Sequence, residues 1–165
     1  MLKRFIPILL IALFMASCGK QTIYDVNSFL TAADTLTEQE IVIKGTVTHV
    51  CVHSGKKCFI KAEGSEETIK IETGGEIESF SQDLIGKEVI VLGIVKESRT
   101  EQADIESKEA AINETKLEAL EATDEETVEH CDAAQKSLDN MKKWMKDHGK
   151  DYYAVYYIEG IKQLK

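Results

Sequence analysis

A β-hairpin expected over residues 45–61 is the feature that most constrains the fold of this chain. The stretch is GTVTHVCVHSGKKCFIK, in which two strand-like segments flank the polar turn SGKK. Side chains alternate between the two faces of a strand, so His49, Cys51 and His53 are expected to point the same way. If the turn is a four-residue loop, His53 pairs with Cys58, which then joins that face. We call these four residues the hairpin patch.

Three further strands and two short helices are expected around this hairpin. The five strands are predicted at residues 41–52, 58–62, 67–72, 87–96 and 153–164. A first helix is expected at residues 25–33, and a second at residues 76–85, where Ile77, Phe80 and Leu84 follow helical spacing. The order of three strands, a helix and two strands is that of an OB-fold barrel. The sequence therefore predicts a mainly β chain with an α insertion, built on a five-stranded OB-fold barrel.

An insertion between the fourth and fifth strands, at about residues 97–149, has a different character. Residues 97–127 carry 11 acidic and 3 basic side chains, which indicates a solvated helix over about residues 101–121. Thr123 and Glu126 have the spacing of a capping box that would open a second helix. The second helix has apolar residues spaced 3, 4, 3 and 4 apart, namely Cys131, Ala134, Leu138, Met141 and Met145. A helical hairpin inserted into the barrel is therefore expected.

The N-terminus has the features of a secretory signal. Residues 1–17 combine Lys3 and Arg4 with a short apolar run, and small residues precede Cys18. This arrangement resembles a bacterial lipobox, which predicts cleavage before Cys18, lipidation of that cysteine and a tether over residues 18–24. No acidic residue follows Cys18 directly, which by resemblance to known sorting rules favours the outer membrane, facing the periplasm. An ordinary signal peptide with an incidental cysteine and an uncleaved anchor are the alternatives.

The charge of the mature chain narrows the class of partner. Cleavage after residue 17 would leave 148 residues, enough for one domain at residues 25–165. Loss of Lys3 and Arg4 would change the formal net charge from −9 to −11. Phosphate backbones and anionic headgroups repel such a chain, so we expect no nucleic-acid partner and membrane attachment through the lipid on Cys18.

Three segments carry a resemblance to a known group of proteins. They are VIKGTVTHVCVHSGKKCFI, LIGKEVIVLGIVKE and YYIEGIK, spread over about residues 25–162. The chain resembles a group of bacterial OB-fold lipoproteins with a Val-Cys-x-His-x-Gly-Lys-Lys hairpin. The matching residues are Val50, Cys51, His53, Gly55, Lys56 and Lys57. The resemblance implies a fold and a location rather than an activity.

The hairpin patch has the ligand types of a transition-metal site. Thiolate and imidazole groups bind zinc, and copper accepts the same set. Residues two apart on a strand lie roughly 6.6 Å apart, so three from one strand cannot all reach one ion without a bulge. Two of them with Cys58 across the hairpin, and a fourth ligand from His130 or Cys131, would suit a Zn or Cu ion.

Two other interpretations of the cysteines remain open. The first is a disulfide between Cys51 and Cys58, which needs a bulge near Gly55 because diagonal neighbours are about 7–8 Å apart. The second is buried thiols and surface histidines without a chemical role. With Cys18 lipidated, the remaining three cysteines are an odd number, so they cannot all pair within one chain.

These observations favour two functions, neither of them catalytic. No nucleophile–base pair, paired-carboxylate signature or phosphate loop is recognisable, so no enzyme is predicted. The first hypothesis is a lipid-anchored periplasmic OB-fold binding protein that holds a transition metal, or a metal-containing ligand such as haem, at the hairpin patch. The second is a non-catalytic interaction or assembly lipoprotein, in which the helical insertion docks an envelope protein and the cysteines are structural.

Overall fold

The computed structural model describes residues 22–165, and the predicted signal at residues 1–17 and the lipidated Cys18 lie outside them. The strands are β1 (Ile23–Asp25), β2 (Glu40–Val50), β3 (Lys57–Lys61), β4 (Thr68–Glu72), β5 (Glu88–Glu101) and β6 (Tyr152–Gln163). The helices are α1 (Val26–Leu36), α2 (Gln102–Ala122) and α3 (Glu125–His148), with one 3₁₀ turn, η1 (Gln82–Leu84). Within these residues, no helix has the length and apolarity needed to cross a membrane.

Five strands close into a mixed barrel. They follow the order β2-β3-β4-β6-β5, and β5 pairs back onto β2. All neighbours are antiparallel except β4 and β6, which are parallel. The short β1 adds to β2 in parallel and pairs Ile23 with Val42, although the sequence placed Ile23 in the tether. The predicted five-stranded barrel is thus confirmed and is consistent with an OB-like barrel, whereas the chain as a whole is mixed α/β rather than mainly β.

Helix α1 closes one end of the barrel. Asp25 and Ser28 form a capping box at its start, with Ser28 N donating to Asp25 Oδ1 over 2.8 Å. The apolar residues of α1 follow helical spacing, so they share one face and enter the barrel core. They are Val26, Phe29, Ala33 and Leu36. This end is the one at which β2 begins and at which β5 leaves the barrel.

The opposite end is closed by the segment of residues 73–87, where the predicted helix at residues 76–85 is wrong. The segment contains the short turn η1 instead of that helix. Its backbone is bonded to the barrel, since Glu76 N donates to Ile161 O over 2.7 Å and Phe80 N donates to Gly55 O over 2.8 Å. Those N–H groups are therefore not available to a helical ladder, although Phe80 still reaches the core.

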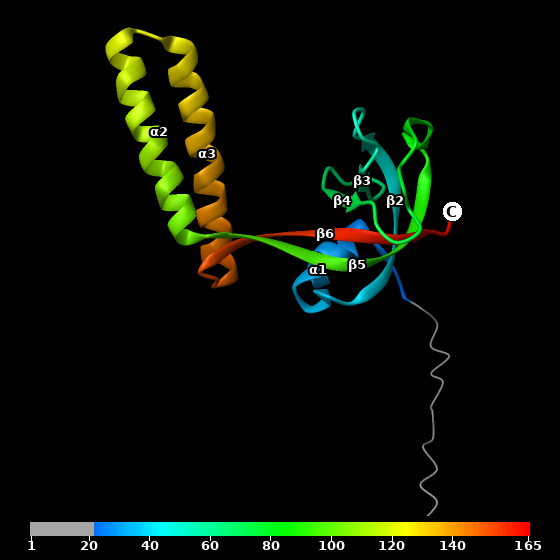
Figure 1. The fold of residues 1–165 in the computed structure, drawn as a ribbon. Coiled ribbons are helices and arrows are strands. Elements are labelled where there is room, and N and C mark those ends of the chain that lie inside the picture. Colours follow the sequence, from blue (N-terminus) through cyan, green and yellow to red (C-terminus); the bar gives the residue numbers. More distant parts are fainter. Residues whose placement is uncertain (1–21) are drawn as a thin grey trace, which may run out of the picture.

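Strands β5 and β6 continue past the barrel as a two-stranded ribbon that carries α2 and α3 (Figure 1). Their pairing runs as far as Glu101 opposite Tyr152, so β5 is longer than the predicted strand at residues 87–96. A helical hairpin is present as predicted, but its helices lie at residues 102–148 instead of filling 97–149, because residues 97–101 continue β5. We call this helical hairpin the arm.

The cap at the start of α3 differs from the prediction by one residue. Asp124 is the N-cap, and its carboxylate accepts from Thr127 N at 3.2 Å. Thr123 instead ends α2 in the left-handed region, with φ of 55°. The tight turn between the helices uses Thr123 in this way, so that residue cannot also cap α3.

Candidate functional site

The strand register separates the residues of the hairpin patch. A bulge between Val47 and His49 shifts the pairing, so that His49 lies opposite Phe59 and Val50 lies opposite Cys58. The predicted pairing of His53 with Cys58 is therefore wrong. Both Val47 and Val50 are buried, which shows that the bulge changes the alternation of faces within β2.

The patch consequently has members on both sides of the barrel wall. Cys58 is completely buried in the barrel core. His49 is exposed, with its ring centroid 5.8 Å from that of Phe59, and His53 is exposed in the turn that follows β2. Within residues 22–165, no three His, Cys, Asp or Glu side chains are grouped so as to hold a metal ion. Zinc or copper binding at this patch stays a prediction that this arrangement does not favour.

The two cysteines of the patch have opposite chemical environments. Cys51, Cys58 and Cys131 are free thiols, so Cys51 and Cys58 are not bridged here. Burial raises the pKa of the Cys58 thiol to about 11. The pKa of Cys51 is lowered, chiefly because Ser54 Oγ donates to its Sγ over 3.4 Å. Cys51 is the thiol of this pair that solvent can reach.

A second group of side chains joins the arm to the barrel. We call it the joint; its members are Asp34, Trp144, His148, Lys150, Tyr152, Tyr153 and Tyr156. Lys150 Nζ is ion-paired with the carboxylate of Asp34 on α1. The hydroxyl of Tyr156 donates to Asp34 Oδ1 over 2.8 Å and accepts from Lys150 over 3.1 Å. A residue between the arm and β6 is thereby tied to the helix that caps the barrel.

Aromatic rings surround the same ammonium group. Lys150 Nζ lies 5.2 Å from the ring centroid of Tyr152, 5.7 Å from that of Trp144 and 5.8 Å from that of Tyr156. Trp144 also stacks on His148 at 4.1 Å and meets Tyr153 edge-on at 5.3 Å. These contacts connect the end of α3 to the start of β6.

The charges of the joint stabilise one another. The hydrogen bond from Lys150 lowers the pKa of Asp34, and the pKa of Lys150 is raised by the same bond. Desolvation raises the pKa of Tyr156 to about 12. Asp34, Lys150 and Tyr156 therefore keep their ordinary protonation state near neutral pH, and the ion pair between Lys150 and Asp34 is intact there.

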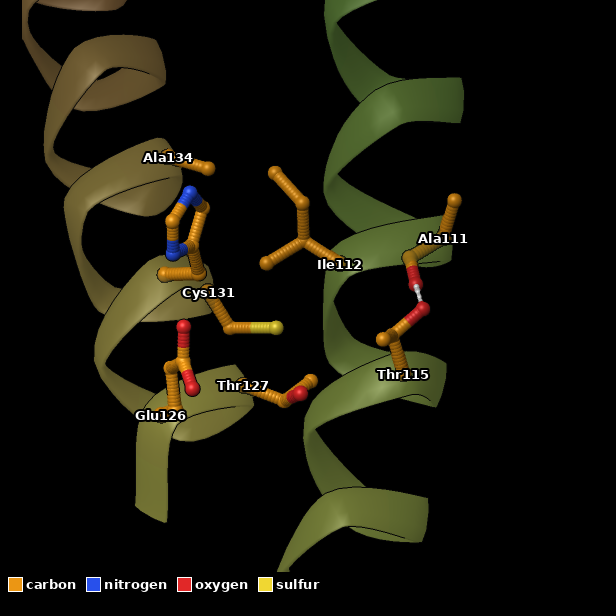
Figure 2. A pocket seen from close by; sticks show the side chains of 8 residues that line it. Ala111, Ile112, Thr115, Glu126, Thr127, Cys131 and Ala134 are labelled. Carbon is orange, nitrogen blue, oxygen red and sulfur yellow. Dashed lines mark hydrogen bonds between the residues drawn. The ribbon is translucent and has the colours of Figure 1, made fainter. Parts of the chain in front are cut away.

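The arm has a narrow apolar interior. The predicted seam of α3 is confirmed, since Cys131, Leu138 and Met145 are buried and pack towards α2. Figure 2 shows the Cys131 thiol and the Ile112 side chain pointing into the space between the two helices. Beside them lies a hollow of about 450 Å³. Ion pairs such as Lys142 with Glu109 at 2.6 Å link the helices where apolar contacts are few.

The far end of the arm combines exposed apolar residues with acidic ones. We call residues 114–132 the arm tip; they carry eight carboxylates and one lysine, Lys116. Leu117 is 64% exposed and Leu120 is 54% exposed. A hollow of about 370 Å³ opens here between the helices and is lined in part by Leu120, Val128 and Glu129.

Sequence reasoning did not find the joint or the hollow at the arm tip. Nothing local in the sequence connects the tyrosines near residues 152–157 with Asp34, and Asp34 lies 116 positions from Lys150. For the arm tip a signal was present, namely Leu117 and Leu120 within an acidic helix. Comparison with known proteins found no matching family model and no matching curated protein.

Proposed function

We propose that this protein is a lipid-anchored, non-catalytic interaction protein of the bacterial envelope. In this proposal the lipid is carried by Cys18 and the domain faces the periplasm from the outer membrane. The barrel is the platform, and the arm presents the partner-binding surface. The sequence features at residues 1–18 support the anchor and the location.

The observation that carries the proposal is the position of the arm. The ribbon of β5 and β6 holds α2 and α3 away from the barrel, so both helices present most of their surface to solvent (Figure 1). At its base, the ion pair between Lys150 and Asp34 fixes the arm to α1. A projecting element with a fixed base and a free end is suited to binding another protein, and it contributes little to the barrel core.

We further propose that the barrel is an OB-fold, with the arm inserted between its fourth and fifth strands. Support comes from the strand order and from the parallel contact of β4 with β6, which closes the barrel between its third and fifth strands. Metal or haem binding has less support, because Cys58 lies in the core while His49 and His53 face solvent.

Replacement of the arm by a short turn tests the proposal. Glu101 and Tyr152 are directly opposite in the ribbon, so residues 102–151 can be exchanged for the two-residue turn Asn-Gly. A photo-crosslinking residue at Glu118 in the arm and, separately, at Glu63 on the barrel would be introduced into the full chain in its own bacterium. We expect a discrete protein adduct from the Glu118 position and none from the Glu63 position.

The arm-replaced chain is the control for specificity. If it keeps the far-UV circular dichroism of a β barrel but no longer recovers the crosslinked protein in pull-downs, the arm is the binding element. Equal recovery with and without the arm would contradict the proposal. Adducts from Glu63 alone would place the binding surface on the barrel instead.

A further inference from the structure

We propose that the arm tip docks a basic segment of a partner protein, which inserts one large apolar side chain between the two helices. The inference rests on the proposed function and names the chemistry of the partner. It concerns the hollow of about 370 Å³ near the turn between α2 and α3.

The apolar part of this surface has no cover from the chain itself. Ala119, Leu120 and Val128 line the hollow, and Leu117 lies one helical turn from Leu120 on the exposed side of α2. Leu117 and Leu120 are both more than half exposed. Because Leu120 also lines the hollow, these two side chains and the hollow form one apolar surface, and such exposed patches mark interaction sites more often than single exposed leucines do.

The polar rim of the hollow is acidic. Besides Thr123 it contains the carboxylates of Asp124, Glu125, Glu129 and Asp132. Asp124 is engaged as the helix cap and Asp132 is paired with Lys116, whereas Glu125 and Glu129 have no ion pair among residues 22–165. The rim therefore presents carboxylates whose charge is not balanced nearby.

This charge selects among the occupants that could cover the apolar surface. A second copy would bring two arm tips together, each with eight carboxylates and one lysine, and like charges repel. An anionic membrane surface is repelled for the same reason. A segment rich in Lys or Arg is attracted, and its charges would face Glu125 and Glu129 while an apolar residue fills the hollow.

The two-helix geometry suggests how such a segment would bind. The arm is a pair of antiparallel helices with a groove between them, and an amphipathic helix laid in a groove uses apolar anchors one turn apart. Leu120 and Val128 come from different helices, so an anchor between them would touch both. The partner helix would then add a third helix to an arm with little interior of its own.

A peptide titration tests the inference. The probe is a fluorescein-labelled, 15-residue helical peptide with leucines on one face and Lys or Arg elsewhere, titrated into the full chain in nonionic detergent and read by anisotropy. We expect saturable binding that weakens as salt is added. Leu120→Ser and Glu129→Lys should each weaken it roughly tenfold, because the first removes the apolar contact and the second reverses a rim charge.

Matched controls make the result decisive. Glu63→Lys changes the net charge as Glu129→Lys does but lies on the barrel, between β3 and β4, so it should leave binding unchanged. A peptide with serines in place of leucines and one with glutamates in place of the basic residues should bind at least tenfold more weakly. Equal binding of either peptide, or unchanged binding by both arm variants, would overturn the inference.

Failure of this inference can be told apart from failure of the proposed function. If the arm-replaced chain loses its envelope partner while the basic peptide does not bind, the arm is the docking element but its partner is not of this class. If sedimentation shows that the chain dimerises and that Leu120→Ser abolishes the dimer, the occupant is a second copy and the inference is wrong.

Discussion

The barrel and the arm are stabilised in different ways. In the barrel, nineteen buried apolar residues form one continuous cluster that includes the inner face of α1. In the arm, the corresponding cluster has three buried members, Ile105, Leu138 and Met145. Burial of apolar area is the main favourable contribution to folding, so the barrel should be the more stable unit.

This difference in buried apolar area suits the barrel to stability and the arm to binding a partner. The barrel sequence alternates apolar and polar residues because each strand has an inner and an outer face. Helix α2 is polar on almost all sides, with Ile105 and Ala119 buried, so it relies on α3 and on ion pairs. A region that buries little can present most of its surface to a partner.

The largest loss of stability is expected from a substitution in the barrel core. Phe29→Ala removes a fully buried ring and should lower the free energy of unfolding by about 3–5 kcal/mol. Chemical denaturation followed by far-UV circular dichroism measures the change. Leu138→Ala is the counterpart in the arm, and it should loosen the arm while the barrel still unfolds at its original midpoint. A shift of the barrel transition by Leu138→Ala equal to that of Phe29→Ala would show that the two regions are one cooperative unit.

A smaller loss of stability is expected from a substitution in the joint. Lys150→Met removes the ion pair with Asp34 and the contacts of the ammonium with the aromatic rings, which should cost about 1 kcal/mol, because Asp34 is largely exposed and its pair is screened. Trp144 is the single tryptophan of the chain, so its fluorescence reports directly on the joint. Lys162→Met, which removes a barrel ion pair with Glu76, is the control and should leave that fluorescence unchanged. Unchanged fluorescence in Lys150→Met would contradict the role given to Lys150.

The change with pH in the stability that Asp34 contributes should be smaller still. The pKa of Asp34 is lowered in the folded protein, so its contribution to stability is present above the ordinary carboxyl pKa of about 4 and is lost as the pH falls through the folded pKa. Asp34→Asn should therefore be less stable than the parent chain at pH 6, and the difference should shrink towards pH 3. Denaturation curves at both pH values measure this. A difference that grows on acidification would have the wrong sign for the ion pair.

The strands of the barrel could be predicted from the sequence, but their register could not. The strand-like segments were sufficient to predict the five barrel strands, and the acidic composition and helical spacing were sufficient to predict the inserted helical hairpin. The bulge between Val47 and His49 was not predictable, because it depends on pairing with Phe59 and Cys58 across the hairpin. A shift of one residue in the register moves every following side chain to the other face of the strand. The bulge therefore separates the four residues that were expected to form the hairpin patch.

The segment after β4 and the joint are two further features that the sequence alone could not predict. Residues 76–85 have helical spacing, but the N–H groups of Glu76 and Phe80 bind the carbonyl groups of Ile161 and Gly55, so tertiary contacts overrode the local pattern. The joint depends on Asp34 and Lys150, which are far apart in the sequence and meet because β6 returns beside α1. Neither contact has a local signature.

The most direct test of the difference between barrel and arm is native-state thiol labelling of the full chain carrying Cys51→Ser. Cys58 is fully buried in the barrel core, so its modification requires the barrel to open, whereas Cys131 is 7% exposed beside a hollow of the arm, so its modification requires only a small movement of the arm. Iodoacetamide labelling followed by mass-spectrometric peptide mapping gives the two rates. We expect Cys131 to be modified well before Cys58, under conditions where the barrel stays folded. Equal rates for the two thiols would mean that arm and barrel open together, and would contradict this expectation.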